Sequence, residues 1–180
     1  MTEEKRNQKQ AGFEVKTFPV PFALSEIKGN ISLRTRDTES KYSKDQIINQ
    51  AFKFHSQGNI KEAEKYYKYF INQGFTDYIV FSNYGAILRD LGNLQDAELY
   101  TRKSIKINPD NALAYSNLGN ILKDLGNLQD AELSYRKAIK LNPDFAEAHS
   151  NLGNILKDLG NLQDAELSYN KAIKLDPKNK

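Results

Sequence analysis

The sequence predicts an all-α fold, a solenoid built from four helix–turn–helix repeats. Three observations lead to this prediction: a 34-residue period, apolar residues at helical spacing within each period, and glycine and proline at fixed positions between them. Of the 180 residues, 39% are hydrophobic and 27% are charged. That balance is typical of an ordered domain with a core, so we do not expect a globally disordered chain.

The period is most regular in the second half of the chain. The segment SNLGNILKDLGNLQDAELSY of residues 116–135 recurs without change at residues 150–169. A close relative begins at Ser82, and a more divergent one begins at Ile48. The predicted repeat array therefore covers residues 44–179, with repeats at 44–77, 78–111, 112–145 and 146–179.

Each repeat is expected to form two helices, as the third repeat illustrates. Its first apolar stripe has spacings of three and four residues, and Gly126 follows as a helix-ending glycine. After the second stripe, Pro143 stops the helix pair, and Asp144 is expected to cap the next helix. The first stripe consists of Leu118, Ile121, Leu122 and Leu125, and the second of Ala131, Tyr135, Ala138 and Ile139.

At its signature positions this pattern resembles the tetratricopeptide repeat (TPR). The matching residues of the third repeat are Leu118, Gly119, Leu122, Gly126, Ala131, Tyr135, Ala138 and Pro143. The resemblance implies a right-handed α-solenoid with the first helix of every repeat on the concave surface. Phrases such as AEAHSNLGN are similar to the repeat array of O-linked N-acetylglucosamine transferases. The first repeat departs from the pattern at Ala51, Phe70 and Phe75.

Residues 1–43 differ from the rest of the chain, because they lack the repeat and are rich in charged and polar residues. We expect a flexible, disordered leader here. The alternative is a short docking element that uses Phe13, Phe18 and Phe22 to pack on the array or on a partner.

One polar position recurs in all four repeats, and it is occupied by Asn49, Asn83, Asn117 and Asn151. The transferase resemblance implies an asparagine ladder that holds the backbone of an extended peptide, and a carboxamide can both donate to and accept from any peptide group. The alternative is a solvated or duplicated residue without function. Asn120 and Asn154 are expected on the same face, with Lys123 and Lys157 beside them. Tandem opposite charges such as Arg89–Asp90 are expected to keep the groove nearly neutral.

The sequence gives little support for catalysis, metal binding, nucleic-acid binding or membrane insertion. The chain has no cysteine, and its histidines are His55 and His149. We expect His149 to be a packed side chain in an aromatic position, and we expect no catalytic residue, metal site or cofactor. The net charge of +3 gives little reason to expect nucleic-acid binding. No apolar run is long enough for a bilayer, and the N-terminus has no secretory signal, so a cytoplasmic location is expected.

The function expected from these features is a non-enzymatic scaffold that binds an extended peptide segment of a protein partner. Two alternatives remain open: a substrate-recruiting arm of a glycosyltransferase- or sulfotransferase-like system, and a self-assembling solenoid. The array ends without a polar capping helix, so Tyr169, Ile173 and Leu175 should be partly exposed. Self-association through this C-terminal face is therefore a further expectation.

Overall fold

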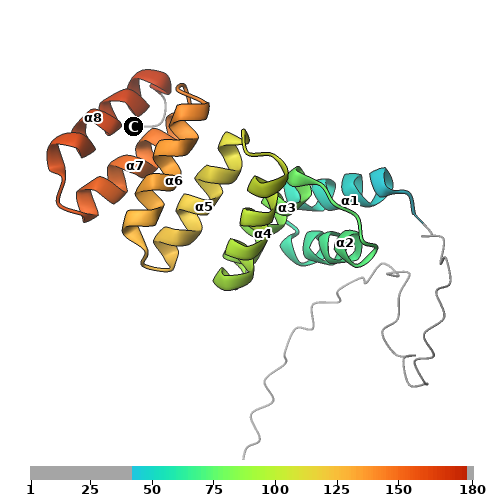
Figure 1. Cartoon of the computed structure of the whole chain (residues 1–180). Helices are drawn as coiled ribbons and strands as arrows, with labels where there is room; N and C mark the ends of the chain where they lie inside the picture. The colour runs from blue at the N-terminus through green and yellow to red at the C-terminus, as the bar shows by residue number, and fades with distance from the viewer. Residues whose placement is uncertain (1–41, 178–180) are drawn as a thin grey trace, which may run out of the picture. The chain divides into compact units, whose positions relative to one another are not determined.

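A computed structural model describes residues 42–177, and this part of the chain is entirely helical between its turns (Figure 1). The helices lie beside one another in chain order, from α1 in blue to α8 in red. Their bounds are α1 Lys44–Ser56, α2 Ile60–Asn72, α3 Tyr78–Asp90, α4 Leu94–Ile107, α5 Ala112–Asp124, α6 Leu128–Leu141, α7 Ala146–Asp158 and α8 Leu162–Leu175. The predicted all-α repeat solenoid is confirmed. The expected leader lies outside the described residues, except for Tyr42 and Ser43.

Some helices of the array start with a side-chain capping bond, as α1 does, and others start without one, as α7 does. Ser43 forms a capping box at the start of α1: its side chain accepts from the Gln46 N–H, and the Gln46 side chain accepts from the Ser43 N–H. The expectation that Asp144 caps α7 is wrong. The N-cap of α7 is Phe145, one residue after Asp144, and no side chain caps this helix. The Asp144 N–H donates to Asn142 Oδ1 at 3.2 Å in the preceding turn.

The turn inside each helix pair depends on a glycine in the left-handed region. Gly126 has a φ of 81°, and its N–H donates to the Lys123 carbonyl while the Asn127 N–H donates to the Leu122 carbonyl. These bonds satisfy carbonyls that the end of α5 would otherwise leave unpaired. Glycines with positive φ occupy the equivalent turns at Gly58, Gly92 and Gly160.

Within a repeat, the two helices approach closely at a second glycine. A Cβ atom on Gly119 of α5 would lie 2.6 Å from Cε1 of Tyr135 on α6. The hydrogen side chain therefore leaves room for the Tyr135 ring, which is fully buried. Gly153 meets Tyr169 in the same way in the last repeat.

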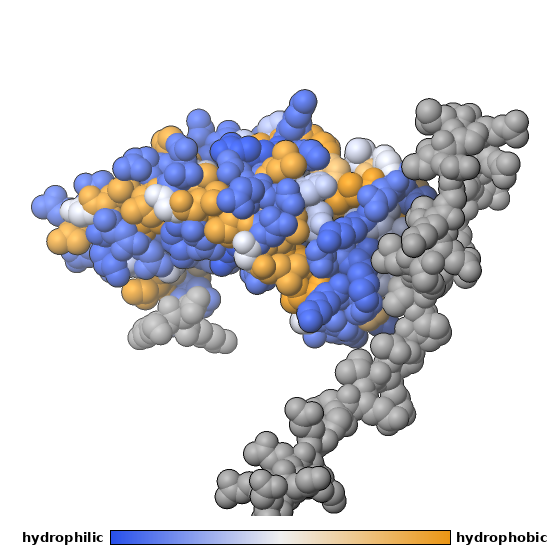
Figure 2. Space-filling model, turned by 90° about the horizontal axis from the view of Figure 1, so that it is seen from below, coloured by the Kyte–Doolittle hydropathy of each residue, from blue (hydrophilic) through white to orange (hydrophobic). Residues whose placement is uncertain are grey.

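The first helices of successive repeats form the inner side of the array. α3 contacts α5, and α5 contacts α7, whereas neighbouring second helices have no comparable contact. Closer spacing of the first helices places them on the side toward which the array curves. The second helices α2, α4, α6 and α8 form the outer side. The surface carries polar and apolar patches side by side (Figure 2).

The last helix is less covered than its counterparts, as expected. Ile173 is 42% exposed, and Tyr169 and Leu175 are half-buried. Tyr135, the equivalent of Tyr169 one repeat earlier, is fully buried because α7 packs against α6. None of the helices in the described part is long and apolar enough to cross a membrane.

Replacing Gly126 by Ala should lower the free energy of unfolding by about 1 to 2 kcal/mol, because a Cβ is strained at a φ of 81°. Urea unfolding followed by circular dichroism measures the change. The control is Asn127→Ala at the next residue, which is exposed and makes no side-chain capping bond. Equal effects of the two substitutions would contradict the conclusion that the turn requires a glycine at Gly126.

Candidate inner-side peptide site

Three of the four ladder asparagines hydrogen-bond to the preceding repeat. Asn117 Nδ2 on α5 donates to Ser82 Oγ on α3 at 3.1 Å. Asn151 Nδ2 on α7 donates to Asn120 Oδ1 on α5 at 3.2 Å. The Asn83 side chain hydrogen-bonds the Tyr67 hydroxyl of α2. These three side chains are half-buried, whereas Asn49 on the first helix is exposed.

The flanking asparagines have a different partner, a tyrosine of their own repeat. The Tyr135 hydroxyl donates to Asn120 Oδ1 at 2.7 Å, and the Tyr169 hydroxyl donates to Asn154 Oδ1 at 2.8 Å. Asn120 is buried, with 9% of its surface exposed. Its Oδ1 therefore accepts two hydrogen bonds, one from its own repeat and one from Asn151 of the next. The result is a chain of bonds that links the two last repeats.

The second repeat lacks both members of the tyrosine–asparagine pair. Thr101 replaces the tyrosine and Ala86 replaces the asparagine. Within the described residues, Thr101 Oγ1 is buried without a hydrogen-bond partner. The tyrosine stands one position earlier, at Tyr100, where its ring packs edge-on against Tyr84 with centroids 4.8 Å apart. In the first repeat the tyrosine is kept as Tyr67, but Phe52 stands at the asparagine position, so the complete pair is present only in the last two repeats.

Burial keeps these tyrosines neutral. It raises the pKa of Tyr135 above its ordinary value of 10.0, and it raises the pKa of Tyr67 to about 12 although the hydrogen bond from Asn83 opposes the shift. Because the Tyr135 hydroxyl keeps its proton, it acts as a donor to Asn120 Oδ1.

The charges at the ends of the first helices pair between repeats. Arg89 of α3 reaches Asp124 of α5 at 2.7 Å, so its partner lies in the next repeat rather than at the adjacent Asp90. Neighbouring side chains on one helix point in different directions, which favours the longer-range contact. Lys123 is half-buried and Lys157 is exposed, and neither forms an ion pair within residues 42–177.

The histidines are both engaged in packing. His149 is 9% exposed, and its Nε2 lies 3.0 Å from the Pro143 carbonyl oxygen, which confirms the expectation of a packed side chain. His55 Nδ1 lies 3.1 Å from the Tyr67 hydroxyl. Among the described residues, no cluster of three or more His, Asp or Glu side chains could hold a metal ion.

The hydrogen bonds between ladder and preceding repeat were not foreseen from the sequence, nor was the tyrosine–asparagine pair. The sequence gives only a weak signal for the pair, because both positions are lost in the second repeat but the first repeat keeps the tyrosine, as Tyr67, without the asparagine. No comparable signal identifies the Arg89–Asp124 contact, because both residue types recur as neighbours in the same helix.

His55 should make stability depend on pH. Burial lowers the pKa of His55 below 6.5, with a smaller opposing effect of Asp90, so the folded array binds fewer protons there than the unfolded chain. Stability is therefore full above pH 6.5 and falls as the pH drops through the folded-state pKa. Urea unfolding at about pH 7.5 and about pH 5 should show a larger loss for the wild type than for His55→Gln. An equal loss in both proteins would contradict this assignment.

Known proteins share this architecture. Models described as "TPR repeat" match residues 119–160, and models described as "Tetratricopeptide repeat" match residues 80–111, 100–132 and 146–179. No curated protein matches the chain.

Among solved structures, MamA matches with a TM-score of 0.69 and 21% identity over 76% of this chain and 80% of that one. YrrB, "a TPR protein with an unusual peptide-binding site", matches with a TM-score of 0.67 and 20% identity over 76% and 71%. A TPR protein from Parabacteroides merdae matches with a TM-score of 0.64 and 23% identity over 76% and 54%. These similarities establish the fold, and together with the family models they show that the chain is built of tetratricopeptide repeats.

Proposed function

We propose that the chain is a non-enzymatic interaction scaffold that binds an extended segment of a protein partner along the inner side of its repeats. The observation that carries this proposal is the arrangement of Asn117 and Asn151. Each amide nitrogen is held by the preceding repeat, and within residues 42–177 neither Oδ1 accepts a hydrogen bond. A side chain fixed in this way loses little conformational freedom when it accepts from a peptide N–H.

The other residues predicted for the peptide site have secondary roles in this proposal. Asn120 and Asn154 hold the tyrosines and position the ladder rather than contact the peptide, because their Oδ1 atoms are already used. Lys123 and Lys157 stand at the ends of the first helices and are available to a carboxylate of the partner. Asn49 is exposed and extends the ladder to the first repeat.

The expected complex is weak and tolerant of sequence. A neutral hydrogen bond contributes about 0.5 to 1.5 kcal/mol net, so a four-asparagine ladder contributes a few kcal/mol. Association costs about 4 to 15 kcal/mol in lost freedom of motion, so side-chain contacts must supply the rest. A peptide-binding TPR protein of similar fold, YrrB, is consistent with such use of the repeats.

The double variant Asn117→Ala/Asn151→Ala should lose most of the partner that the wild type retains in a pull-down from native lysate. The matched control is Asn127→Ala/Asn161→Ala, which removes two asparagines that also recur every 34 residues but lie exposed in the turns. Circular dichroism must first show that both variants are folded. Quantified recovery of the same partner compares the three proteins.

The proposal would be overturned if the folded ladder variant retained the partner as well as the wild type. It would also fail if the turn variant lost the partner to the same degree, because binding would then not reside on the inner side.

A further inference from the structure

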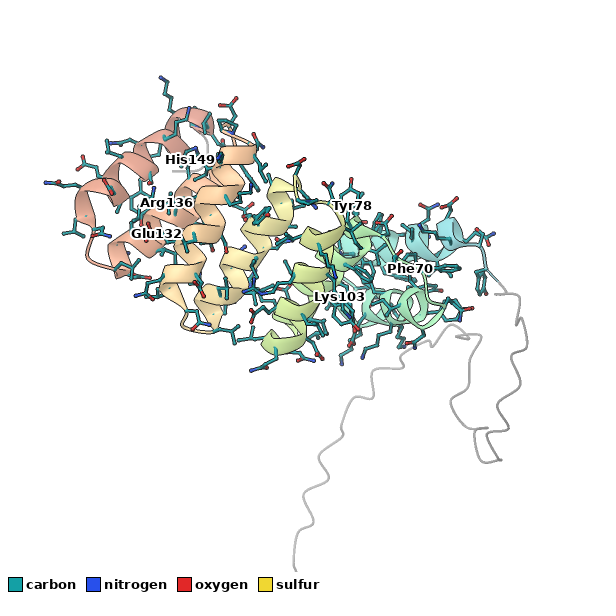
Figure 3. All side chains as sticks on the ribbon, viewed as in Figure 1. Phe70, Tyr78, Lys103, Glu132, Arg136 and His149 are labelled. Atoms are coloured by element: carbon teal, nitrogen blue, oxygen red, sulfur yellow. The ribbon has the colours of Figure 1, made fainter. Side chains whose placement is uncertain are left out.

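The outer side of the array carries a hollow of about 380 Å³ between the last two repeats. Ile139 and Lys140 of α6 form one wall, and Leu167 and Lys171 of α8 form the other. His149 of α7 lies between them, and Arg136 closes the α6 side. Figure 3 shows Glu132 and Arg136 on α6 and His149 on the neighbouring helix. This surface is distinct from the asparagine ladder.

The equivalent grooves between the earlier repeats are filled by the protein's own aromatic rings. Between the second and third repeats, Lys137 Nζ lies 5.7 Å from the centre of the Tyr115 ring. Between the first and second repeats, Tyr100 packs against Phe81 with centroids 5.9 Å apart, and Lys103 Nζ lies 4.5 Å from the Tyr100 ring centre. In both grooves an aromatic ring lies beneath a lysine.

The last groove is unfilled because His149 stands at the position of Tyr115. Its smaller ring turns to the Pro143 carbonyl, with Nε2 3.0 Å away. Lys171, the equivalent of Lys137, lies 3.9 Å from a carboxylate oxygen of Asp144 instead of over a ring. The space that Tyr115 and Tyr100 occupy in the other grooves is therefore open.

The charge around this hollow is one-sided. Its lining residues include four basic side chains, Arg136, Lys140, His149 and Lys171, and no acidic one. Glu132 pairs with Arg136 at 2.7 Å, but Lys140 forms no ion pair within residues 42–177. Leu167 adds an apolar edge and is 68% exposed. The surface therefore combines an apolar slot with one cation, Lys140, that is not already paired, while Arg136 pairs with Glu132 and Lys171 lies near Asp144.

We propose that this outer groove binds a protein segment in which an aromatic side chain is flanked by acidic residues. The aromatic ring occupies the slot between Ile139 and Leu167, beneath Lys171, as Tyr115 lies beneath Lys137. A neighbouring carboxylate pairs with Lys140. The recognised chemistry is therefore a ring together with a negative charge, and neither suffices alone.

The test uses fluorescence anisotropy with a fluorescein-labelled peptide, Gly-Ser-Asp-Phe-Glu-Gly-Ser, and the full chain. Wild type should bind saturably, and His149→Tyr should weaken binding by about tenfold or more because the new ring fills the groove. Since Tyr115 occupies the same position one repeat earlier, His149→Tyr is compatible with the fold. Lys140→Glu should also weaken binding.

The matched variant works in the opposite direction. Tyr115→His should open the groove between the second and third repeats and raise the stoichiometry from one peptide to two. A control peptide with Ser in place of Phe, and another with Asn and Gln in place of the acids, should each bind much more weakly.

Three results would overturn the proposal. Absence of saturable binding to wild type at millimolar protein excludes the site. Unchanged binding by folded His149→Tyr places the peptide elsewhere. Equal binding of the Ser-containing peptide, or full competition by single-stranded DNA, shows attraction to charge alone.

Discussion

One chain of side-chain hydrogen bonds crosses the boundary between the third and fourth repeats. The Tyr135 hydroxyl on a second helix donates to Asn120 on its own first helix, and Asn151 on the next first helix donates to the same oxygen. Tyr135 and Asn120 are buried and Asn151 is half-buried, so leaving the shared Asn120 oxygen unpaired is costly. A shift of the fourth repeat against the third would break the chain, and hence these bonds hold the spacing between α5 and α7.

In our proposal, bonds of this kind prepare the inner side for recognition. The amides of Asn117 and Asn151 are oriented by the preceding repeat before any ligand arrives, while their Oδ1 atoms are left for a partner. The outer side follows a different rule. There the grooves are closed by rings of the array itself, except where His149 replaces a tyrosine. The solenoid thus has a polar inner surface and, between its last two repeats, an outer groove with an apolar slot and basic side chains.

Much of the fold could be predicted from the sequence, because the period and the two apolar stripes are local patterns. The glycine turns at Gly126 and its equivalents followed from the same pattern. The capping residue of α7 could not be predicted, because Asp is a favoured N-cap residue type, whereas the structure has Phe145 at this position without a side-chain capping bond. The asparagine ladder was visible as a recurring letter, but its bonds were not. These bonds depend on the distance between Asn151 of one repeat and Asn120 of the preceding one, and the period of the sequence does not give that distance.

The outer groove also could not be predicted from the sequence alone. His149 was expected as a packed residue, which is correct, yet the space it leaves exists only relative to Tyr115. In the sequence, His149 at the position of Tyr115 is one aromatic ring replaced by a smaller one. The hollow that this leaves is visible only when α6, α7 and α8 are packed together. Peptide recognition on either side remains our proposal, whereas the repeat fold is established by the model and by the comparisons.

The most direct test of the central claim is a double-mutant cycle between Tyr135→Phe and Asn151→Ala, measured by urea unfolding. These residues belong to different repeats and are joined only through Asn120 Oδ1 in this chain of bonds. We predict a coupling free energy of about 0.5 kcal/mol or more. Strictly additive effects of the two substitutions would contradict the claim that this chain of bonds holds the repeats in register.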